Sequence, residues 1–252
     1  MRLLLLNANA SQSITDLVVA AARPLVSPDT ELIGVTGRFG PLYIGTRAAY
    51  AIAGHAALDA YAASGRDADA VVLACFGDPG LGALREVANV PVVGMAEAGC
   101  RAAAQDGRRF AVVTGGQRWI PMLTEYIGAL GLSSQLAVVH AVAPTGADIA
   151  ADPERSIALL ADACHTAATR FGSDVVVLGG AGLAPIAPRV AAMLDFPVID
   201  GLAAAIAAAE AAASAPDRFV SPDRLTDPLP AVGLTAELDA LLQQRSAGSA
   251  AS

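Results

Sequence analysis

Cys75 is the side chain of this sequence best suited to chemistry, because it stands at the end of a predicted strand. It follows the apolar run Val71–Ala74 and precedes the glycine-rich segment "FGDPG". We predict that Asp78 caps the next helix and that Pro79 is its first residue, so the thiol would lie close to a helix N-terminus. The helix dipole would lower the pKa of the thiol and favour a reactive thiolate. The alternative is an ordinary small buried side chain.

Two further segments carry polar side chains at the ends of apolar runs. The segment "NANAS" supplies Asn7, Asn9 and Ser11 after the first run, and Thr114 follows the run "FAVV". Amide and hydroxyl groups can donate to a carboxylate or an imide, so Asn9 and Thr114 are candidate substrate anchors. The first segment could instead cap a helix, with Ser11 or Ser13 as the N-cap.

The other cysteines and the histidines indicate neither a metal centre nor a disulfide framework. The three cysteines and three histidines are scattered, without the spacing of a metal site or of paired thiols. Cys100 and Cys164 lie in alanine-rich helical segments, and we expect both to be ordinary buried side chains. The sequence contains no lysine, which excludes Schiff-base chemistry and a lysine-dependent phosphate loop.

The composition favours a small-molecule ligand. The chain has 252 residues, of which 54% are hydrophobic and 16% charged, with a formal net charge of −8. This is enough apolar material for one large domain or two lobes, and the negative charge argues against nucleic acid or an anionic membrane as partner. The opening apolar run is too short for a signal peptide or a membrane span. We therefore expect a cytoplasmic protein.

The two halves of the sequence repeat the same pattern of strands and helices. The segment "RRFAVVTGGQRW" resembles the opening "RLLLLNANAS", "DVVVLGG" resembles "DAVVLAC", and "FPVIDG" resembles "VPVVGM". Asn7 thereby matches Thr114, and Cys75 matches Gly180, at offsets of about a hundred residues. Strands that alternate with helices are typical of parallel sheets. We predict an α/β fold of two pseudo-symmetric, Rossmann-like lobes with parallel sheets.

This pattern predicts the organisation of the chain. The first lobe comprises residues 1–97 plus about 205–245, the second lobe residues 98–204, and residues 246–252 form a flexible tail. We expect the chain to cross between the lobes where helices begin after Glu97 and after Asp200. Ligands bind at the carboxyl ends of parallel strands. The active site should therefore lie in the cleft between the lobes.

Several side chains near the predicted cleft could shape the pocket, but the sequence does not fix the direction in which they point. Candidates for the pocket walls are Phe39, Tyr43, Trp119 and Ile120. The charged residues near the loops are Asp78 and Glu97, which we interpret as helix caps.

Five blocks, taken in order, resemble the aspartate/glutamate/hydantoin racemase superfamily, and especially its hydantoin and allantoin racemase branch. They are "LLNANAS", "ACFGDPGLGALRE", "PVVGMAEA", "VVTGGQRW" and "VVVLGGAGLA". The resemblance spans roughly residues 1–212. It implies two facing lobes, with one cysteine from each flanking the α-carbon of the substrate. One thiolate removes the proton and the opposite thiol returns one on the other face, without a cofactor or a metal. It also implies a homo-oligomer.

The chain departs from that pattern at its second cysteine. Cys75 falls on the first cysteine, whereas Gly180 stands in "GGAG" where the family has "GCAG". A glycine has no side chain to exchange a proton. Gly180 could be natural or an engineered replacement of a catalytic cysteine, and both origins would give this sequence. The resemblance also implies a group of backbone N–H donors that stabilises an enolate or carboxylate of the substrate, and Gly180 lies beside it. Its residues are Phe76, Gly77, Ala181 and Gly182.

Three functions follow from the departure at Gly180. The first is a racemase or epimerase that uses Cys75 at the carbon alpha to a carbonyl of a hydantoin or amino-acid-like substrate, with water or another group at the second face. The second is a one-cysteine lyase similar to arylmalonate decarboxylase, in which Cys75 protonates an enolate after carbon dioxide leaves. The third is a binding protein without catalysis. The sequence blocks favour the racemase.

Overall fold

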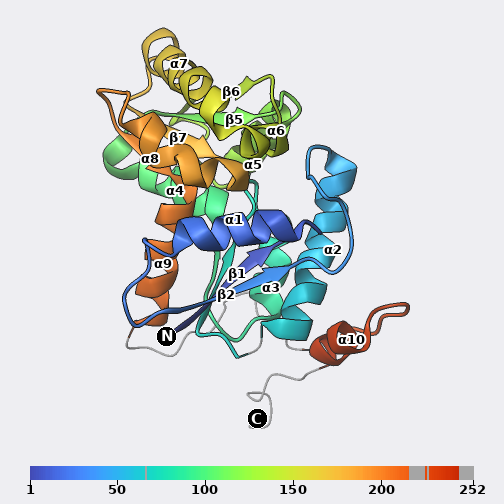
Figure 1. The fold of residues 1–252 in the computed structure, drawn as a ribbon. Helices are drawn as coiled ribbons and strands as arrows, with labels where there is room; N and C mark the ends of the chain where they lie inside the picture. The colour runs from blue at the N-terminus through green and yellow to red at the C-terminus, as the bar shows by residue number, and fades with distance from the viewer. Residues whose placement is uncertain (66, 216–224, 226, 244–252) are drawn as a thin grey trace.

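The computed structural model describes residues 1–65, 67–215, 225 and 227–243. Its described strands form two four-stranded parallel sheets that face each other in two lobes (Figure 1). The first sheet has the order β2-β1-β3-β4, and the second has the order β6-β5-β7-β8. The predicted α/β fold with two parallel lobes is therefore confirmed.

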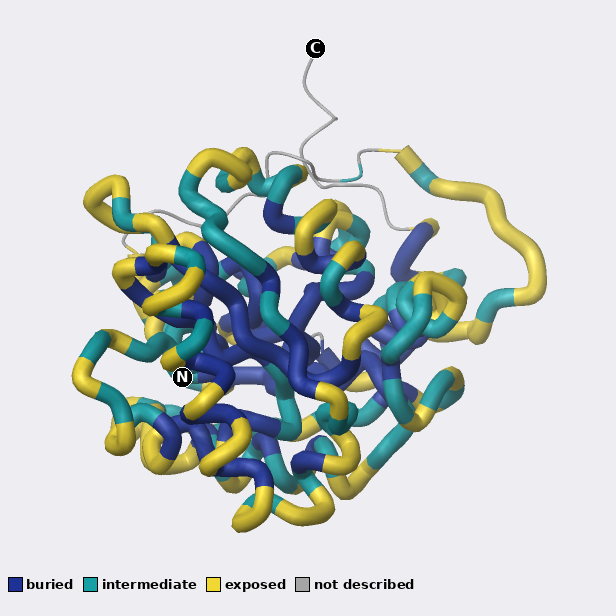
Figure 2. The backbone as a smooth tube through the Cα atoms, turned by 90° about the horizontal axis from the view of Figure 1, so that it is seen from above, coloured by how far each residue is buried: buried dark blue, intermediate teal, exposed yellow. Residues whose placement is uncertain are grey.

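The strands of each sheet have the following bounds. In the first they are β1 (Arg2–Asn7), β2 (Glu31–Thr36), β3 (Ala70–Leu73) and β4 (Val92–Gly94), and in the second β5 (Phe110–Gly115), β6 (Leu136–Val142), β7 (Val175–Gly179) and β8 (Val198–Asp200). The central strands are almost completely buried, as Figure 2 shows by their dark blue colour. Apolar runs without polar alternation form such strands because helices cover both faces of a parallel sheet.

The helices follow the strands in turn. Those of the first half are α1 (Gln12–Ala22), α2 (Arg47–Ser64), α3 (Leu81–Val87) and α4 (Met95–Ala103), followed by the short 3-10 helix η1 (Gln105–Gly107). Those of the second half are α5 (Trp119–Ala129), α6 (Gly146–Ala151), α7 (Pro153–Phe171), the 3-10 helix η2 (Ala181–Ile186), α8 (Ala187–Ala191), α9 (Gly201–Ala213) and α10 (Ala236–Leu242). No helix in the described ranges is long and apolar enough to cross a membrane.

The strand register makes Cys75 and Gly180 equivalent positions. Leu6 pairs with Leu73 in the first sheet, and Val113 pairs with Leu178 in the second. Cys75 and Gly180 each lie two residues beyond the second member of these pairs. The internal repeat seen in the sequence therefore corresponds to a structural repeat, in which both loops leave the sheets at the same point.

The helices α4 and α9 cross between the lobes. Each follows the last strand of one sheet but packs on the other: α4 contacts β7, and α9 contacts β3. The helix α4 begins at Met95, two residues before Glu97, so the prediction that it begins after Glu97 was wrong. The start of α9 directly after Asp200 is as predicted, since the Asp200 carboxylate accepts from the backbone N–H of Leu202.

The C-terminal helix α10 packs against α2 of the first lobe. The buried carboxylate of Asp59 accepts two hydrogen bonds from Arg38 and one from the Thr235 hydroxyl, which also caps α10. We propose the division into residues 1–97 and about 205–245 in the first lobe and 98–204 in the second, and the contacts of α9 and α10 are consistent with it. Residues 216–224, 226, 244 and 245 of this division lie outside the described residues. The predicted tail, residues 246–252, lies outside the described residues.

Candidate active site

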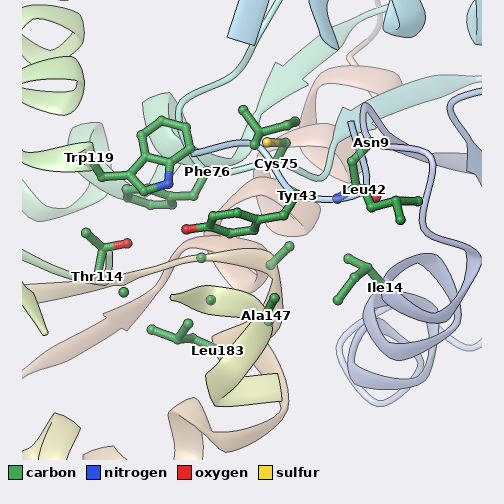
Figure 3. Close-up of a pocket in the computed structure, with 16 residues that line it drawn as sticks. Asn9, Ile14, Leu42, Tyr43, Cys75, Phe76, Thr114, Trp119, Ala147 and Leu183 are labelled. Atoms are coloured by element: carbon green, nitrogen blue, oxygen red, sulfur yellow. The ribbon is translucent and has the colours of Figure 1, made fainter. Parts of the chain in front are cut away.

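A cavity of about 70 Å³ lies between the lobes at the carboxyl ends of their strands (Figure 3). Most of the predicted site residues line it, namely Asn9, Cys75, Phe76, Thr114, Gly180, Ala181 and Gly182. Gly77 is the predicted residue that does not. The loops after β1, β3, β5 and β7 therefore meet as the parallel topology predicts.

Cys75 presents a mostly buried thiol to this cavity. Its side chain is 8% exposed, and the residue lies in the loop between β3 and α3. Burial raises the pKa of the Cys75 thiol well above its usual range, and the nearby Asp78 carboxylate adds to the shift. The predicted lowering of this pKa was therefore wrong, because burial disfavours the charged thiolate and the helix expected directly after the loop begins only at Leu81. The resting side chain is a neutral thiol.

Asp78 caps a different helix from the one predicted. The helix α3 begins only at Leu81, with Gly80 as its N-cap, so Asp78 and Pro79 do not open it. Instead, the Asp78 carboxylate accepts hydrogen bonds from the backbone N–H groups of Ala96 and Glu97 at 2.9 and 2.8 Å, in the first turn of α4. Asp78 has a positive φ of 54°, which turns its side chain toward α4.

The Asp78 carboxylate also connects the two lobes. It accepts a 2.7 Å hydrogen bond from the hydroxyl of Tyr126, on α5 of the second lobe. Burial raises the pKa of Asp78 to about 6, although its three donors oppose the shift. The predicted second cap, Glu97, lies in the first turn of α4 and instead forms ion pairs with Arg85 and Arg101. Asp78 thus fixes the loop of Cys75 against the second lobe.

Gly77 lies behind the cavity wall rather than in it. Its φ of 116° favours glycine, and a Cβ at this position would lie 2.6 Å from the Trp119 ring. The Gly77 carbonyl accepts a 2.7 Å hydrogen bond from the Tyr50 hydroxyl. The loop after Cys75 therefore needs glycine here for close packing against Trp119, and Gly77 supports the site without facing it.

Gly180, the position in the second lobe that is equivalent to Cys75, has no side chain that can exchange a proton. Gly180 has a φ of 147°, a backbone conformation that other residues rarely adopt. A Cβ at this position would lie 2.9 Å from the end of the Leu183 side chain. The backbone here is thus adapted to glycine, and Leu183 makes this side of the cavity apolar.

Several residues that line the cavity carry hydrogen-bond donors that have no partner among the described residues. The backbone N–H groups of Phe76, Ala181 and Gly182 donate to no other group in the described part of the chain. The buried Thr114 hydroxyl likewise has no partner among the described residues. Such groups can stabilise an enolate or a carboxylate of a bound substrate. The arrangement fits the donor group predicted from the sequence, except that Gly77 lies outside it.

The "NANAS" loop is held by its own side chains. The Asn7 amide donates to Asn9 Oδ1 at 2.9 Å and to Thr15 Oγ1 at 3.0 Å. Asn9 Oδ1 also accepts from the backbone N–H of Ser11. This fixes the Asn9 side chain and leaves its Nδ2 without a protein partner in the described ranges, available to a ligand. Ser11 is the N-cap residue of α1, but its side chain makes no capping hydrogen bond.

The sequence predicted only some of the apolar and aromatic residues that line the cavity. Of the candidate walls, Tyr43 and Trp119 line the cavity, whereas Phe39 packs edge-to-face on His55 and Ile120 lies elsewhere. Ile14, Leu42 and Ala147 also line it. Leu42 lies in the loop before α2, where apolar residues occur outside any helix or strand. Such apolar loop residues could have indicated a place in the cavity wall.

The remaining ionisable groups in the described ranges include side chains of the types that bind metal ions. No group of three His, Cys, Asp or Glu side chains within the described residues could hold a metal ion. Cys100 and Cys164 are 0% exposed in α4 and α7, so both are buried side chains as predicted.

The sequence matches a family model and several named proteins. Residues 3–209 match the model described as Asp/Glu/Hydantoin racemase. Over 143 residues the chain is 37% identical to a hydantoin racemase of Rhizobium meliloti, an alignment that covers 57% of this chain and 59% of that protein. Over 211 residues it is 30% identical to a hydantoin racemase of Pseudomonas sp. strain NS671, covering 83% of this chain and 85% of that protein.

Solved structures resemble the fold. An allantoin racemase from Pseudomonas fluorescens superimposes with a TM-score of 0.80 at 31% identity, covering 84% of this chain and 90% of that one. Arylmalonate decarboxylase superimposes with a TM-score of 0.59 at 20% identity, covering 86% of this chain and 94% of that one. The second likeness concerns the fold alone.

Proposed function

The chain belongs to the Asp/Glu/hydantoin racemase family, and from this premise we propose that it racemises a hydantoin-like small molecule through Cys75, without a cofactor. Family membership makes the protein an isomerase. The observation that carries the proposed chemistry is the Cys75 thiol, which faces a cavity that also holds unengaged donors. The substrate class and the role of Cys75 are parts of the proposal.

The first step is removal of the α-proton. A Cys75 thiolate takes the proton, the C–H electron pair moves to the carbonyl oxygen, and an enolate and a neutral thiol result. The N–H groups of Phe76, Ala181 and Gly182 and the Thr114 hydroxyl are available to the enolate oxygen. Asn9 Nδ2 is available to an imide carbonyl. Preorganised donors of this kind stabilise charge that develops in the transition state.

The second step distinguishes this site from one with two cysteines. Return of the proton by Cys75 restores the original configuration, whereas inversion needs a proton at the face toward Gly180. Gly180 has no side chain, and Leu183 next to it is apolar. In this proposal a water molecule donates that proton, and the hydroxide that remains takes the proton of the Cys75 thiol through solvent, which restores the thiolate. We expect exchange of the α-hydrogen with solvent to be faster than inversion.

The experiment follows a single enantiomer of 5-methylhydantoin in D₂O by proton NMR and chiral chromatography. Deuterium should enter at C5, with loss of optical purity at a lower rate. Because the thiolate is the base and burial raises the pKa of Cys75, the exchange rate should rise from pH 7 to pH 9 without levelling off. Equal rates of exchange and inversion would contradict proton delivery by water.

Variants separate the Cys75 role from general loss of structure. Cys75→Ala should abolish enzyme-dependent exchange, while Cys164→Ala, which removes a buried thiol from α7, should retain it. Exchange by Cys75→Ala at the wild-type rate would refute the assignment of the base.

A lyase is the second candidate, favoured by the neutral Cys75 thiol opposite an apolar wall. In an arylmalonate, the bond to one carboxylate would break and its electrons would form an enolate as carbon dioxide leaves. The Cys75 thiol would then donate its proton to one face, and water would reprotonate the thiolate. Release of carbon dioxide from phenylmalonate, with one enantiomer as product, would support this reaction over racemisation.

A further inference from the structure

The cleft between the lobes contains a second, outer cavity. Its volume is about 400 Å³, and it lies where the N-termini of α2 and α5 approach each other, lined by Thr46, Gln117 and Arg118 among others. The inner and outer cavities share two lining residues, Tyr43 and Trp119. These two side chains therefore stand between Cys75 and the outer cavity.

Tyr43 extends from the first lobe to the second. It lies in the loop between β2 and α2, and in Figure 3 its hydroxyl points toward Thr114 and Trp119. A Cβ on Gly116 of the second lobe would lie 3.0 Å from this hydroxyl. Burial raises the pKa of Tyr43, and the Trp119 side chain and the Gly146 backbone near its phenol oxygen act in the opposite direction.

Trp119 and Tyr43 differ in how much of the surrounding core packs against them. The Trp119 ring is 6% exposed, packs edge-to-face with Tyr50 and fits closely over Gly77. Its loss would leave a large hole in the core. Tyr43 is half-buried, belongs to no helix or strand, and lines both cavities, while its ring lies close to Gly45. Its side chain can therefore change without loss of the fold.

We infer that the Tyr43 ring is the wall that limits the size of the substituent on the reacting carbon, so that the enzyme selects substrates with a small α-substituent. This inference rests on the proposed function. The cavity next to Cys75 has a volume of about 70 Å³, and the cavity beyond the ring, which is open to solvent, has a volume of about 400 Å³. Removal of the ring would join the two cavities and admit an aryl group.

The test compares Tyr43→Ala with the matched variant Tyr43→Phe on 5-methylhydantoin and 5-benzylhydantoin. Deuterium exchange at C5 gives kcat/KM for each substrate. In Tyr43→Ala the preference for methyl over benzyl should fall by about tenfold or more. In Tyr43→Phe, which keeps the ring and loses the hydroxyl, the preference should stay at the wild-type value. If Tyr43→Phe changed the methyl-to-benzyl preference as much as Tyr43→Ala, the effect would belong to the hydroxyl. That result would refute the inference that the Tyr43 ring limits substituent size.

A second readout needs no substrate, and so separates this inference from the proposed function. Iodoacetamide and its N-phenyl derivative alkylate thiols, and Cys100 and Cys164 are fully buried. Tyr43→Ala should accelerate alkylation of Cys75 by the phenyl reagent far more than by iodoacetamide, while Tyr43→Phe should not. If the ratio of the two alkylation rates were the same in Tyr43→Ala as in the wild type, the Tyr43 ring would not limit access to Cys75. This conclusion would hold even if no hydantoin is a substrate.

Discussion

At the scale of the residue, the site depends on one thiol and one glycine. Cys75 and Gly180 occupy equivalent positions in the two lobes, but they contribute opposite properties to the cavity. The thiol is neutral because its burial disfavours the thiolate. Gly180 contributes a backbone conformation, with a φ of 147°, and Leu183 beside it lines the cavity. A proton-exchanging side chain at position 180 would be strained in this backbone conformation and would displace the end of Leu183.

A side chain at position 180 should therefore destabilise the protein. We expect Gly180→Ala and Gly180→Cys each to lower the free energy of unfolding by about 1–3 kcal/mol, the cost of a side chain in a strained backbone region. Urea unfolding measures the change. The control is Gly82→Ala in α3, where a Cβ meets nothing within 4 Å. That variant should be more stable by about 0.5–1 kcal/mol. Wild-type stability of Gly180→Ala would contradict this account.

At the scale of the element, the start of α4 organises the site. Asp78 comes from the loop that carries Cys75, but it caps a helix that packs on the second lobe. Tyr126 adds a third donor from α5. A single carboxylate thus joins the catalytic loop, the crossover helix and the opposite lobe. A buried carboxylate is tolerated at such a point because its hydrogen-bonding capacity is used.

Removal of the Tyr126 hydroxyl should weaken this junction. Tyr126→Phe should cost about 1–3 kcal/mol of unfolding free energy, because a donor to a buried carboxylate is lost. It should also raise the pKa of Asp78 above its value of about 6, since the lost hydrogen bond lowers that pKa. Urea unfolding and an NMR titration of the Asp78 carboxyl carbon test both effects.

The matched control for this junction is Tyr50→Phe. It removes a hydrogen bond to the Gly77 carbonyl and leaves the three donors to Asp78 in place. If Tyr50→Phe shifted the pKa of Asp78 as much as Tyr126→Phe, the direct role of Tyr126 would be refuted.

At the scale of the whole molecule, the two lobes are held together by elements that each lobe contributes to the other. The helices α4 and α9 pack against each other as well as on the opposite sheets. Phe76 lies between the lobes, where a Cβ on Gly179 or Gly201 would contact its ring. The bidentate ion pair of Arg47 with Glu125 adds an exposed link, whose contribution to stability should be small. The homo-oligomer stays a prediction.

Buried carboxyl groups should set the pH dependence of stability. Burial raises the pKa values of Asp78 and Asp200 to about 6, whereas an aspartate in the unfolded chain titrates near 3.9. Between these values the folded protein holds more protons than the unfolded one, so stability falls as pH rises through this window. We expect each of the two groups to lower the free energy of unfolding by roughly 2 kcal/mol between pH 4.5 and pH 7, or roughly 4 kcal/mol together.

Urea unfolding between pH 3 and pH 8 measures this profile. Below about pH 4 stability should fall again, because Arg38 holds the pKa of Asp59 below its usual value and that carboxylate becomes protonated. Asp78→Asn should flatten the decline between pH 4.5 and pH 7. A steady rise in stability from pH 4.5 to pH 7 would contradict the assignment.

The sequence by itself determined the architecture and most of the site. Continuous apolar runs, helical periodicity and the internal repeat predicted two parallel lobes, because these patterns report local burial directly. The repeat also matched Cys75 with Gly180, and the loops after the strands contained the residues that line the cavity. Parallel topology brings such loops together whatever the details of packing.

Only the tertiary structure decided how these residues behave. It showed that the pKa of Cys75 is raised, that Asp78 caps α4 and that Gly77 lies behind the wall. It also showed that Tyr43 crosses to the second lobe. Each of these facts depends on contacts between segments far apart in the chain. Desolvation, hydrogen bonding to a distant helix and the shape of a cavity have no local pattern, so the sequence carries no direct signal for them.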